Sequence, residues 1–253
     1  MSELVAPDGD GILVDSEPIA ASKQQRVVVF DLDGTLVRGD SFGSFLRVLM
    51  LREPVRAVAS LLSAVILVPL FLVPGTRDRA VSGFVWLATV GLAPDRFDTL
   101  AREFAREHAA GPRRITVALD QLASHLQAGD RVIVATGSAD PVASAVCDAL
   151  GLAGVEVIAA RLSRGRRAWR VREGCLGDAK VRRLEQAGIV TPIACAYSDS
   201  ALDLPLLRAA VRPVLVDPTP GALRRARAAL GADLEVLRTP QRPSPKAARA
   251  NHS

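Results

Sequence analysis

The sequence has few of the residues that build disulfide frameworks, zinc sites and aromatic platforms for nucleic acid. Its 253 residues include three cysteines, three histidines and one tyrosine, and aromatic residues make up 4% of the chain. Three scattered cysteines exclude a disulfide framework or a zinc site and favour a reducing compartment. So few stacking side chains lead us to expect no nucleic-acid partner. The histidines, His108, His125 and His252, lack metal-ligand spacing and are expected at the surface.

The N-terminus lacks the pattern of a secretion signal, and both ends are rich in polar residues. The N-terminus has no basic segment followed by a continuous apolar run, as a secretion signal would. We predict that residues 1–25 form a disordered leader. Within it, Asp8 and Asp10 resemble the start of a calcium loop, but Ile19 stands where that loop needs its last glutamate. The net charge is +5, and residues 236–253 are predicted to form a disordered basic tail.

What the chain does have is enough apolar sequence for a full core. Hydrophobic residues make up 49% and charged residues 23% of the chain. Short β-branched or apolar runs at 26–30, 131–135, 192–197 and 211–216 predict strands, with helical segments between them. One such helix is predicted over 141–150, with Asp140 as its N-cap and Gly151 at its end. The alternation predicts a parallel α/β sheet with its ligand site at the carboxyl ends of the strands.

A long insertion separates the first two predicted strands. We predict that residues 38–122 form a helical cap, and that residues 26–37 and 123–235 form the catalytic core. Residues 57–76 carry no charge and are about as long as a minimal bilayer span. A single crossing would place the strands of one sheet on opposite sides of the membrane. We therefore expect re-entry or interfacial insertion against anionic head groups, with a buried cap helix as the alternative.

The first predicted strand ends in a cluster of acidic residues and a glycine. Asp31 and Asp33 stand one residue apart, so keeping both carboxylates together needs a cation or a shared proton. A hard ion such as Mg²⁺ would supply that cation. Gly34 would let its backbone N–H approach a phosphate, and Thr35 would brace the loop. The loop therefore predicts a magnesium and phosphate site.

Further polar residues follow at the ends of the later strands. Thr136 and Gly137 come after the second strand, where a hydroxyl and backbone N–H groups can bind phosphoryl oxygens. Lys180 stands near the start of a predicted helix and would neutralise charge on a transferring phosphoryl group. Asp199 and Asp203 follow the third strand and are spaced to share one face of a helical turn, where they could complete a Mg²⁺ shell.

Taken in order, DLDGT, TGS, a lysine and DSALD resemble the four signature motifs of the haloacid dehalogenase superfamily. The resemblance runs from about Arg26 to Pro220. It implies a Rossmannoid parallel sheet flanked by helices, with an all-helical type-1 cap inserted after the first strand. It also implies an aspartyl-phosphate mechanism, in which Asp31 attacks phosphorus and Asp33 acts as general acid and then general base. Thr136 and Lys180 would hold the phosphoryl oxygens.

The same resemblance implies a metal site. Mg²⁺ would be bound by Asp31, by the main-chain carbonyl of Asp33 and by Asp199. Asp203 and Thr35 would orient these ligands from behind. Because both Asp31 and Asp33 are present, a non-enzymatic membrane adaptor is a weaker alternative.

A closer resemblance concerns the substrate. The segments FDLDGTLVRGDSFGSFLRVL, VATGSADPV, CLGDAKVRRLE and AYSDSALDLPLL look like the phosphatidylglycerophosphatase C family. That resemblance implies a role in phospholipid biosynthesis, with phosphatidylglycerophosphate converted to phosphatidylglycerol at the cytoplasmic face of the plasma membrane. The partners would be an anionic phospholipid substrate and the membrane surface. Two alternatives stay open: a soluble phosphatase acting on a small phosphomonoester such as phosphoserine, and a phosphatidate or lysophosphatidate phosphatase.

Overall fold

The structure is a computed structural model that describes residues 25–73, 76–189, 192–231 and 234–240. The leader with its Asp8–Asp10 pattern and the tail beyond residue 240 lie outside these residues. Across the described residues one sheet has the strand order β4-β3-β2-β1-β5-β6-β7. All neighbours are parallel except β3 and β4, which form an antiparallel hairpin. The strands are β1 Val27–Phe30, β2 Arg131–Ala139, β3 Glu156–Arg164, β4 Trp169–Glu173, β5 Ile193–Ser198, β6 Ala210–Val216 and β7 Glu235–Leu237.

The first strand lies at the centre of the sheet, between β2 and β5. Val28 is in register with Val132 on one side and Cys195 on the other. Val28, Val29 and Phe30 are all fully buried. A strand covered on both faces needs a continuous apolar sequence, which is why this run does not alternate with polar residues. The parallel α/β fold is confirmed, and the carboxyl ends of β1, β2 and β5 meet at one edge.

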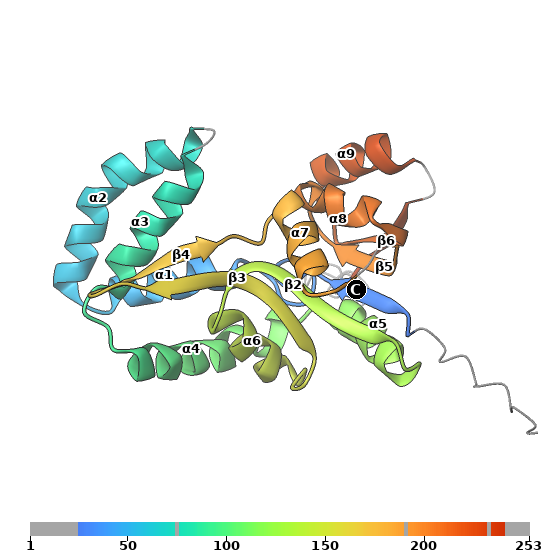
Figure 1. Ribbon diagram of the computed structural model, residues 1–253, viewed down its shortest axis with the longest axis horizontal. Helices are drawn as coiled ribbons and strands as arrows, with labels where there is room; N and C mark the ends of the chain where they lie inside the picture. The colour runs from blue at the N-terminus through green and yellow to red at the C-terminus, as the bar shows by residue number, and fades with distance from the viewer. Residues whose placement is uncertain (1–24, 74–75, 190–191, 232–233, 241–253) are drawn as a thin grey trace, which may run out of the picture.

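Helices cover both faces of the sheet, and a separate group extends from one end (Figure 1). In Figure 1, α4, α5 and α6 lie below the sheet and α7, α8 and α9 above it, while α2 and α3 form a pair that projects at the left. The helix bounds are α1 Ser41–Leu51, α2 Pro54–Leu72, α3 Arg77–Thr89, α4 Pro94–His108, α5 Thr116–Gln127, α6 Val142–Leu150, α7 Asp178–Gln186, α8 Leu204–Arg208 and α9 Pro220–Leu230.

Two details around the second strand differ from the predictions. The strand continues to Ala139 instead of ending at residue 135, so Thr136 and Gly137 lie within it, where the pairing with β3 shifts register. The predicted N-cap, Asp140, is also wrong, because Pro141 occupies the cap position of α6. The end of that helix is as predicted, since Gly151 takes a left-handed conformation with φ of 87°.

The second helix is apolar and exposed. Val55 is 81% exposed and Leu72 is 75% exposed. The alternative of a helix buried inside the cap is therefore wrong. Within the described part of the chain, we find no helix whose length and apolarity would let it cross a bilayer.

Two of the histidines expected at the surface are buried, and that prediction is wrong. His108 is 4% exposed. His125 lies 2.7 Å from Asp130 Oδ2 through Nδ1 and 2.9 Å from the Tyr197 hydroxyl through Nε2. Tyr197 in turn stacks on Phe30, with 4.1 Å between ring centroids. These partners come from α5, from the start of β2 and from β5, so no local sequence pattern could reveal them. His252 lies outside the described residues.

Candidate active site

A cavity of about 800 Å³ opens at the carboxyl ends of the central strands. The core contributes the loop after β1, the end of β2, the start of α7 and the turn after β5. The helices α1 and α3, which belong to the predicted cap, contribute further residues. Ligands of parallel α/β sheets bind at this edge, because the loops that follow the strands converge there. The predicted residues that line the cavity are Asp31, Asp33, Gly34, Thr136, Gly137, Lys180, Asp199 and Asp203.

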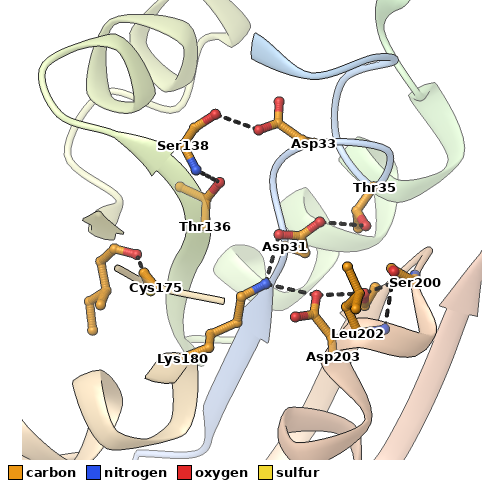
Figure 2. Close-up of polar contacts among 12 residues, drawn as sticks. Asp31, Asp33, Thr35, Thr136, Ser138, Cys175, Lys180, Ser200, Leu202 and Asp203 are labelled. Carbon is orange, nitrogen blue, oxygen red and sulfur yellow. Dashed lines mark hydrogen bonds and ion pairs between the residues drawn. The ribbon is translucent and has the colours of Figure 1, made fainter. Parts of the chain in front are cut away.

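A buried charge cluster forms the floor of this cavity (Figure 2). Lys180 Nζ lies 2.8 Å from Asp31 Oδ1 and 2.7 Å from Asp203 Oδ2. Asp203 Oδ2 also accepts a hydrogen bond from Ser198 Oγ at 2.8 Å. Lys180 is only 1% exposed. Asp203 thus holds the lysine in place, a more direct role than the orienting one that the sequence suggested.

The pKa values of this cluster follow from burial and charge. Burial raises the pKa of Asp31 to about 7, against the lowering effect of Lys180. Burial would lower the pKa of Lys180, but Asp31 and Asp203 outweigh it and hold that pKa above its ordinary value. The lysine therefore stays cationic near neutral pH. One cation does not suffice to keep Asp31 fully ionised there.

Asp33 is held by two hydroxyl groups at the cap side of the cavity. Its Oδ1 accepts from Ser41 N at 2.9 Å and from Ser41 Oγ at 2.5 Å. Its Oδ2 accepts from Ser138 Oγ at 2.5 Å, as Figure 2 shows. Ser138 Oγ also accepts from Phe42 N at 3.1 Å, which ties β2 to the start of α1. Burial raises the pKa of Asp33, and the hydrogen bonds from Ser138 and Ser41 oppose this.

Gly34 is needed where it stands, but for a different reason from the predicted one. Its N–H donates to Val37 O at 2.7 Å, so the prediction that this N–H binds phosphate is wrong. Its φ is 83°, and a Cβ atom built there would lie 2.4 Å from Asp199 Oδ2. Only glycine lets Asp199 come this close to the nucleophile loop. Burial raises the pKa of Asp199 to about 6.

The remaining predicted residues make weaker contacts. Thr35 Oγ1 lies 3.4 Å from Asp31 Oδ2, which places it behind the nucleophile. Thr136 is fully buried, and its Oγ1 accepts from Ser138 N at 3.1 Å. Its hydroxyl hydrogen has no acceptor among the described residues, so it can donate to a ligand. Gly137 lies on the cavity wall beside Leu176.

The chemistry of the site fits a hard divalent cation. Asp31 and Asp199 offer carboxylate oxygens and Asp33 offers its main-chain carbonyl oxygen, and oxygen atoms are the ligands that Mg²⁺ prefers. Burial raises the pKa of each carboxyl group, and the lowering effect of Lys180 on Asp31 and Asp199 does not cancel this rise, so a further cation would favour their ionised forms. Among the residues that the structure describes, the buried Oδ1 of Asp203 has no hydrogen-bond partner. Over the described ranges, no three His, Cys, Asp or Glu side chains are already grouped as a metal site. The fit therefore rests on charge and ligand type.

Three serines take part that the sequence did not single out as site residues. Ser41 and Ser138 bind Asp33, and Ser198 binds Asp203. Ser198 directly precedes Asp199, and Ser138 completes the TGS motif. Their position beside predicted site residues was a usable signal. Ser41 follows the N-cap of α1 and gave no such signal.

The fold and the site together define a class of enzyme. A carboxylate at the end of the central parallel strand, paired with a buried lysine, is an arrangement suited to phosphoryl transfer. Residues 28–208 match the model of the haloacid dehalogenase-like hydrolases. The chain therefore belongs to this family, as its four motifs suggested.

Comparison with individual proteins gives a similar picture. The chain is 37% identical over 108 residues to a phosphoserine phosphatase of Halobacterium salinarum, a match that covers 40% of this chain and 51% of that protein. It thus spans about half the length of this curated relative. Among solved structures, a Bordetella pertussis protein of unknown function has a TM-score of 0.66 at 26% identity, covering 84% and 98% of the two chains. A phospho-aspartyl intermediate analogue of phosphoserine phosphatase has a TM-score of 0.53 at 15% identity, covering 90% and 99%, and so supports the fold.

Proposed function

We propose that this chain is a phosphatase that hydrolyses phosphomonoesters through a phosphorylated Asp31. The observation that carries the proposal is the buried contact of Asp31 Oδ1 with Lys180 Nζ at 2.8 Å. A carboxylate confined beside a fixed cation can approach a phosphoryl group whose negative charge would otherwise repel it.

In the first step, an oxygen of Asp31 attacks phosphorus and the bond from phosphorus to the alcohol oxygen breaks. Asp33 gives its proton to the departing oxygen. Burial raises the pKa of Asp33, which is the direction that a general acid requires. Lys180 and the Thr136 hydroxyl donate to the phosphoryl oxygens, where negative charge gathers in the transition state.

In the second step, Asp33 removes a proton from a water molecule, which attacks phosphorus. The bond between phosphorus and Asp31 then breaks, releasing inorganic phosphate and restoring both carboxyl groups. We propose that Asp31, Asp199 and the main-chain carbonyl of Asp33 hold Mg²⁺, which when bound would offset the negative charge of the phosphate and of the carboxylates. Burial raises the pKa of Asp31 to about 7, so such a cation would increase the ionised fraction of the nucleophile near neutral pH.

We further propose that the substrate is a phosphorylated lipid such as phosphatidylglycerophosphate. The cavity supports this, because its walls away from the charge cluster are largely apolar. Leu176 and Leu202 line it from the core, and both are about half exposed, at 49% and 57%. The apolar residues that α1 and α3 contribute to the same cavity are Phe42, Leu46, Met50, Val81 and Phe84.

The second candidate substrate is a small phosphomonoester such as phosphoserine. The relatives named above favour it, since they include phosphoserine phosphatases. The cavity offers one feature in its support, because Asp40 and Arg47 of the cap line it too. An acid and a base there could pair with the ammonium and carboxylate groups of an amino acid.

The test compares released phosphate from phosphatidylglycerophosphate in mixed micelles, from phosphatidate in the same micelles and from phosphoserine, each with Mg²⁺. The lipid proposal predicts the highest kcat/KM for phosphatidylglycerophosphate. The same assay on Leu202→Asp should show a raised KM for the lipid and an unchanged KM for phosphoserine. Val211→Asp is the matched control, because Val211 is 73% exposed and does not line the cavity. Faster turnover of phosphoserine than of either lipid would establish the second candidate instead.

A further inference from the structure

One long side of α2 presents large apolar side chains to solvent. Leu61 is 73%, Leu62 68% and Val65 75% exposed. Their spacing of three and four residues keeps them on neighbouring turns, so they form one continuous surface. Exposed apolar surface of this kind marks an interaction site when it is contiguous. We call it the apolar face, and its members are Val55, Val58, Leu61, Leu62, Val65, Ile66, Val68 and Leu72.

A second unusual surface lies at the tip of the β3–β4 hairpin. Four exposed arginines, Arg164, Arg166, Arg167 and Arg170, line a hollow of about 540 Å³ together with Trp86 of α3. We call them the hairpin arginines. Among the residues that the structure places, none of their guanidinium groups forms an ion pair with a carboxylate. Their positive charge is therefore available to an outside anion.

The two surfaces lie on elements that contact each other. Gly91, just after α3, donates its N–H to Arg167 O at 2.8 Å, and Trp169 N donates to Thr89 Oγ1 at 3.0 Å. Arg56 of α2 donates to Ala88 O at the end of α3. The hairpin tip thus packs at the end of the α2–α3 pair where α2 begins and α3 ends, as Figure 1 shows at the left.

We propose that the apolar face and the hairpin arginines form a single docking surface for an anionic lipid bilayer. The side chains of the two surfaces suit the layers of a bilayer. The apolar face would contact the outer part of the acyl chains, Trp86 would lie at the interface, and the hairpin arginines would bind the anionic head groups. Trp86 is 40% exposed, as an interfacial anchor must be. A purely apolar partner would leave the arginines unused, and an acidic soluble partner would leave α2 exposed.

Vesicle sedimentation without Mg²⁺ and without substrate tests the proposal separately from the phosphatase activity. The full chain should pellet with vesicles of phosphatidylcholine mixed with phosphatidylglycerol, and only weakly with vesicles of phosphatidylcholine alone. Combining Arg164→Ser, Arg166→Ser and Arg167→Ser should lower the partition coefficient on the mixed vesicles roughly a hundredfold, since each basic residue near such a surface contributes about fivefold. Equal binding of this variant and the wild type would overturn the proposal.

A matched control removes the same charge elsewhere. Arg224→Ser, Arg225→Ser and Arg227→Ser change exposed arginines of α9, which lies at the far end of the molecule from the hairpin in Figure 1. This control should bind the mixed vesicles nearly as well as the wild type. An equal loss in both triple variants would mean that only the overall charge matters, and the docking surface would be refuted.

The apolar face has its own variant. Leu62→Glu places a charge on exposed α2 and should abolish sedimentation with both kinds of vesicle while the circular dichroism spectrum stays unchanged. A second copy of the chain is the rival occupant of this face. Sedimentation velocity should show a monomer in vesicle-free buffer. A stable dimer that Leu62→Glu splits, or vesicle binding that this variant retains, would overturn the proposal.

Discussion

The catalytic end of the sheet and the α2 helix invert the usual relation between polarity and burial. At the sheet edge, Asp31, Lys180 and Asp203 are nearly inaccessible to solvent. On α2, leucine and valine side chains are mostly exposed. Burying charges and exposing apolar surface both cost stability, so neither arrangement serves the fold itself.

This difference separates the region that performs the chemistry from the region that we propose binds the protein to a membrane. Lys180 pairs with the two buried carboxylates of Asp31 and Asp203. The pKa of Asp31 is still raised, so a further cation would stabilise its ionised form. No described residue covers the apolar face, so we infer that an outside partner does. The two regions are linked through the fold, because α2 packs against α1 and α3, and these two helices contribute residues to the wall of the cavity.

The largest effect we predict comes from removing the nucleophile. Asp31→Asn keeps the shape of the side chain but cannot form the phosphorylated intermediate, so kcat should fall by about 10⁴-fold or more. Release of inorganic phosphate from any accepted substrate measures this. After a short incubation with labelled substrate, the label should be found on Asp31 in the wild type. Label on a different residue would remove the basis of the proposed mechanism.

A smaller loss is expected at the general acid. Asp33→Asn should lower kcat about 10²- to 10⁴-fold for an alkyl phosphate, because the alkoxide must then leave unprotonated. With p-nitrophenyl phosphate, whose leaving group needs no proton, the loss in the phosphorylation step should be much smaller. Stopped-flow measurement of the nitrophenolate burst separates the two steps. An equal loss for both substrates would assign Asp33 a purely structural role.

The sequence predicts a site residue well when its signal comes from neighbouring residues in the chain, and poorly when its partners are distant in the chain. Local motifs identified Asp31, Lys180 and Asp199, because each follows a strand or begins a helix whose pattern is visible in the sequence. The partners of Asp33 required the tertiary fold, since Ser41 and Ser138 are 97 residues apart in the chain yet meet at one carboxyl group.

Two errors have similar physical causes. Gly34 was assigned to phosphate because glycine frees the backbone, but its N–H is used by Val37 within the same turn. His125 was placed at the surface because it lacks a metal-ligand pattern, but Asp130 and Tyr197 satisfy both of its ring nitrogens in the interior. Sequence patterns report residue type and spacing, and they do not report which hydrogen-bond partners the fold brings close.

An intermediate effect should appear in the stability of the metal-free protein. Folding raises the pKa of Asp31 from 3.8 to about 7, so between these pH values the folded state holds a proton that the unfolded state has lost. This contribution stabilises the fold at low pH and is lost as pH rises through about 7. From about pH 5 to pH 8 the free energy of unfolding should fall by roughly 3 kcal/mol more in the wild type than in Asp31→Asn.

Urea denaturation with a chelator present measures this difference in slope. The raised pKa of Asp199, about 6, acts in the same direction in both proteins and cancels in the comparison. Adding Mg²⁺ should stabilise the wild type more at pH 8 than at pH 5, since only ionised carboxyl groups bind the ion. Parallel slopes in wild type and variant would show that Asp31 is ionised in the folded protein without a metal.

The smallest effect should come from the apolar face of α2, and it bears most directly on the contrast between the two regions. Leu61→Ala should change the free energy of unfolding by less than about 0.5 kcal/mol, because Leu61 is 73% exposed and leaves no cavity when shortened. The same substitution at Leu122 of α5, which is fully buried, should cost about 2–5 kcal/mol. Urea denaturation of both variants measures the pair. A loss above 2 kcal/mol at Leu61 would mean that this face is covered within the free protein, and the reason for assigning it an outside partner would disappear.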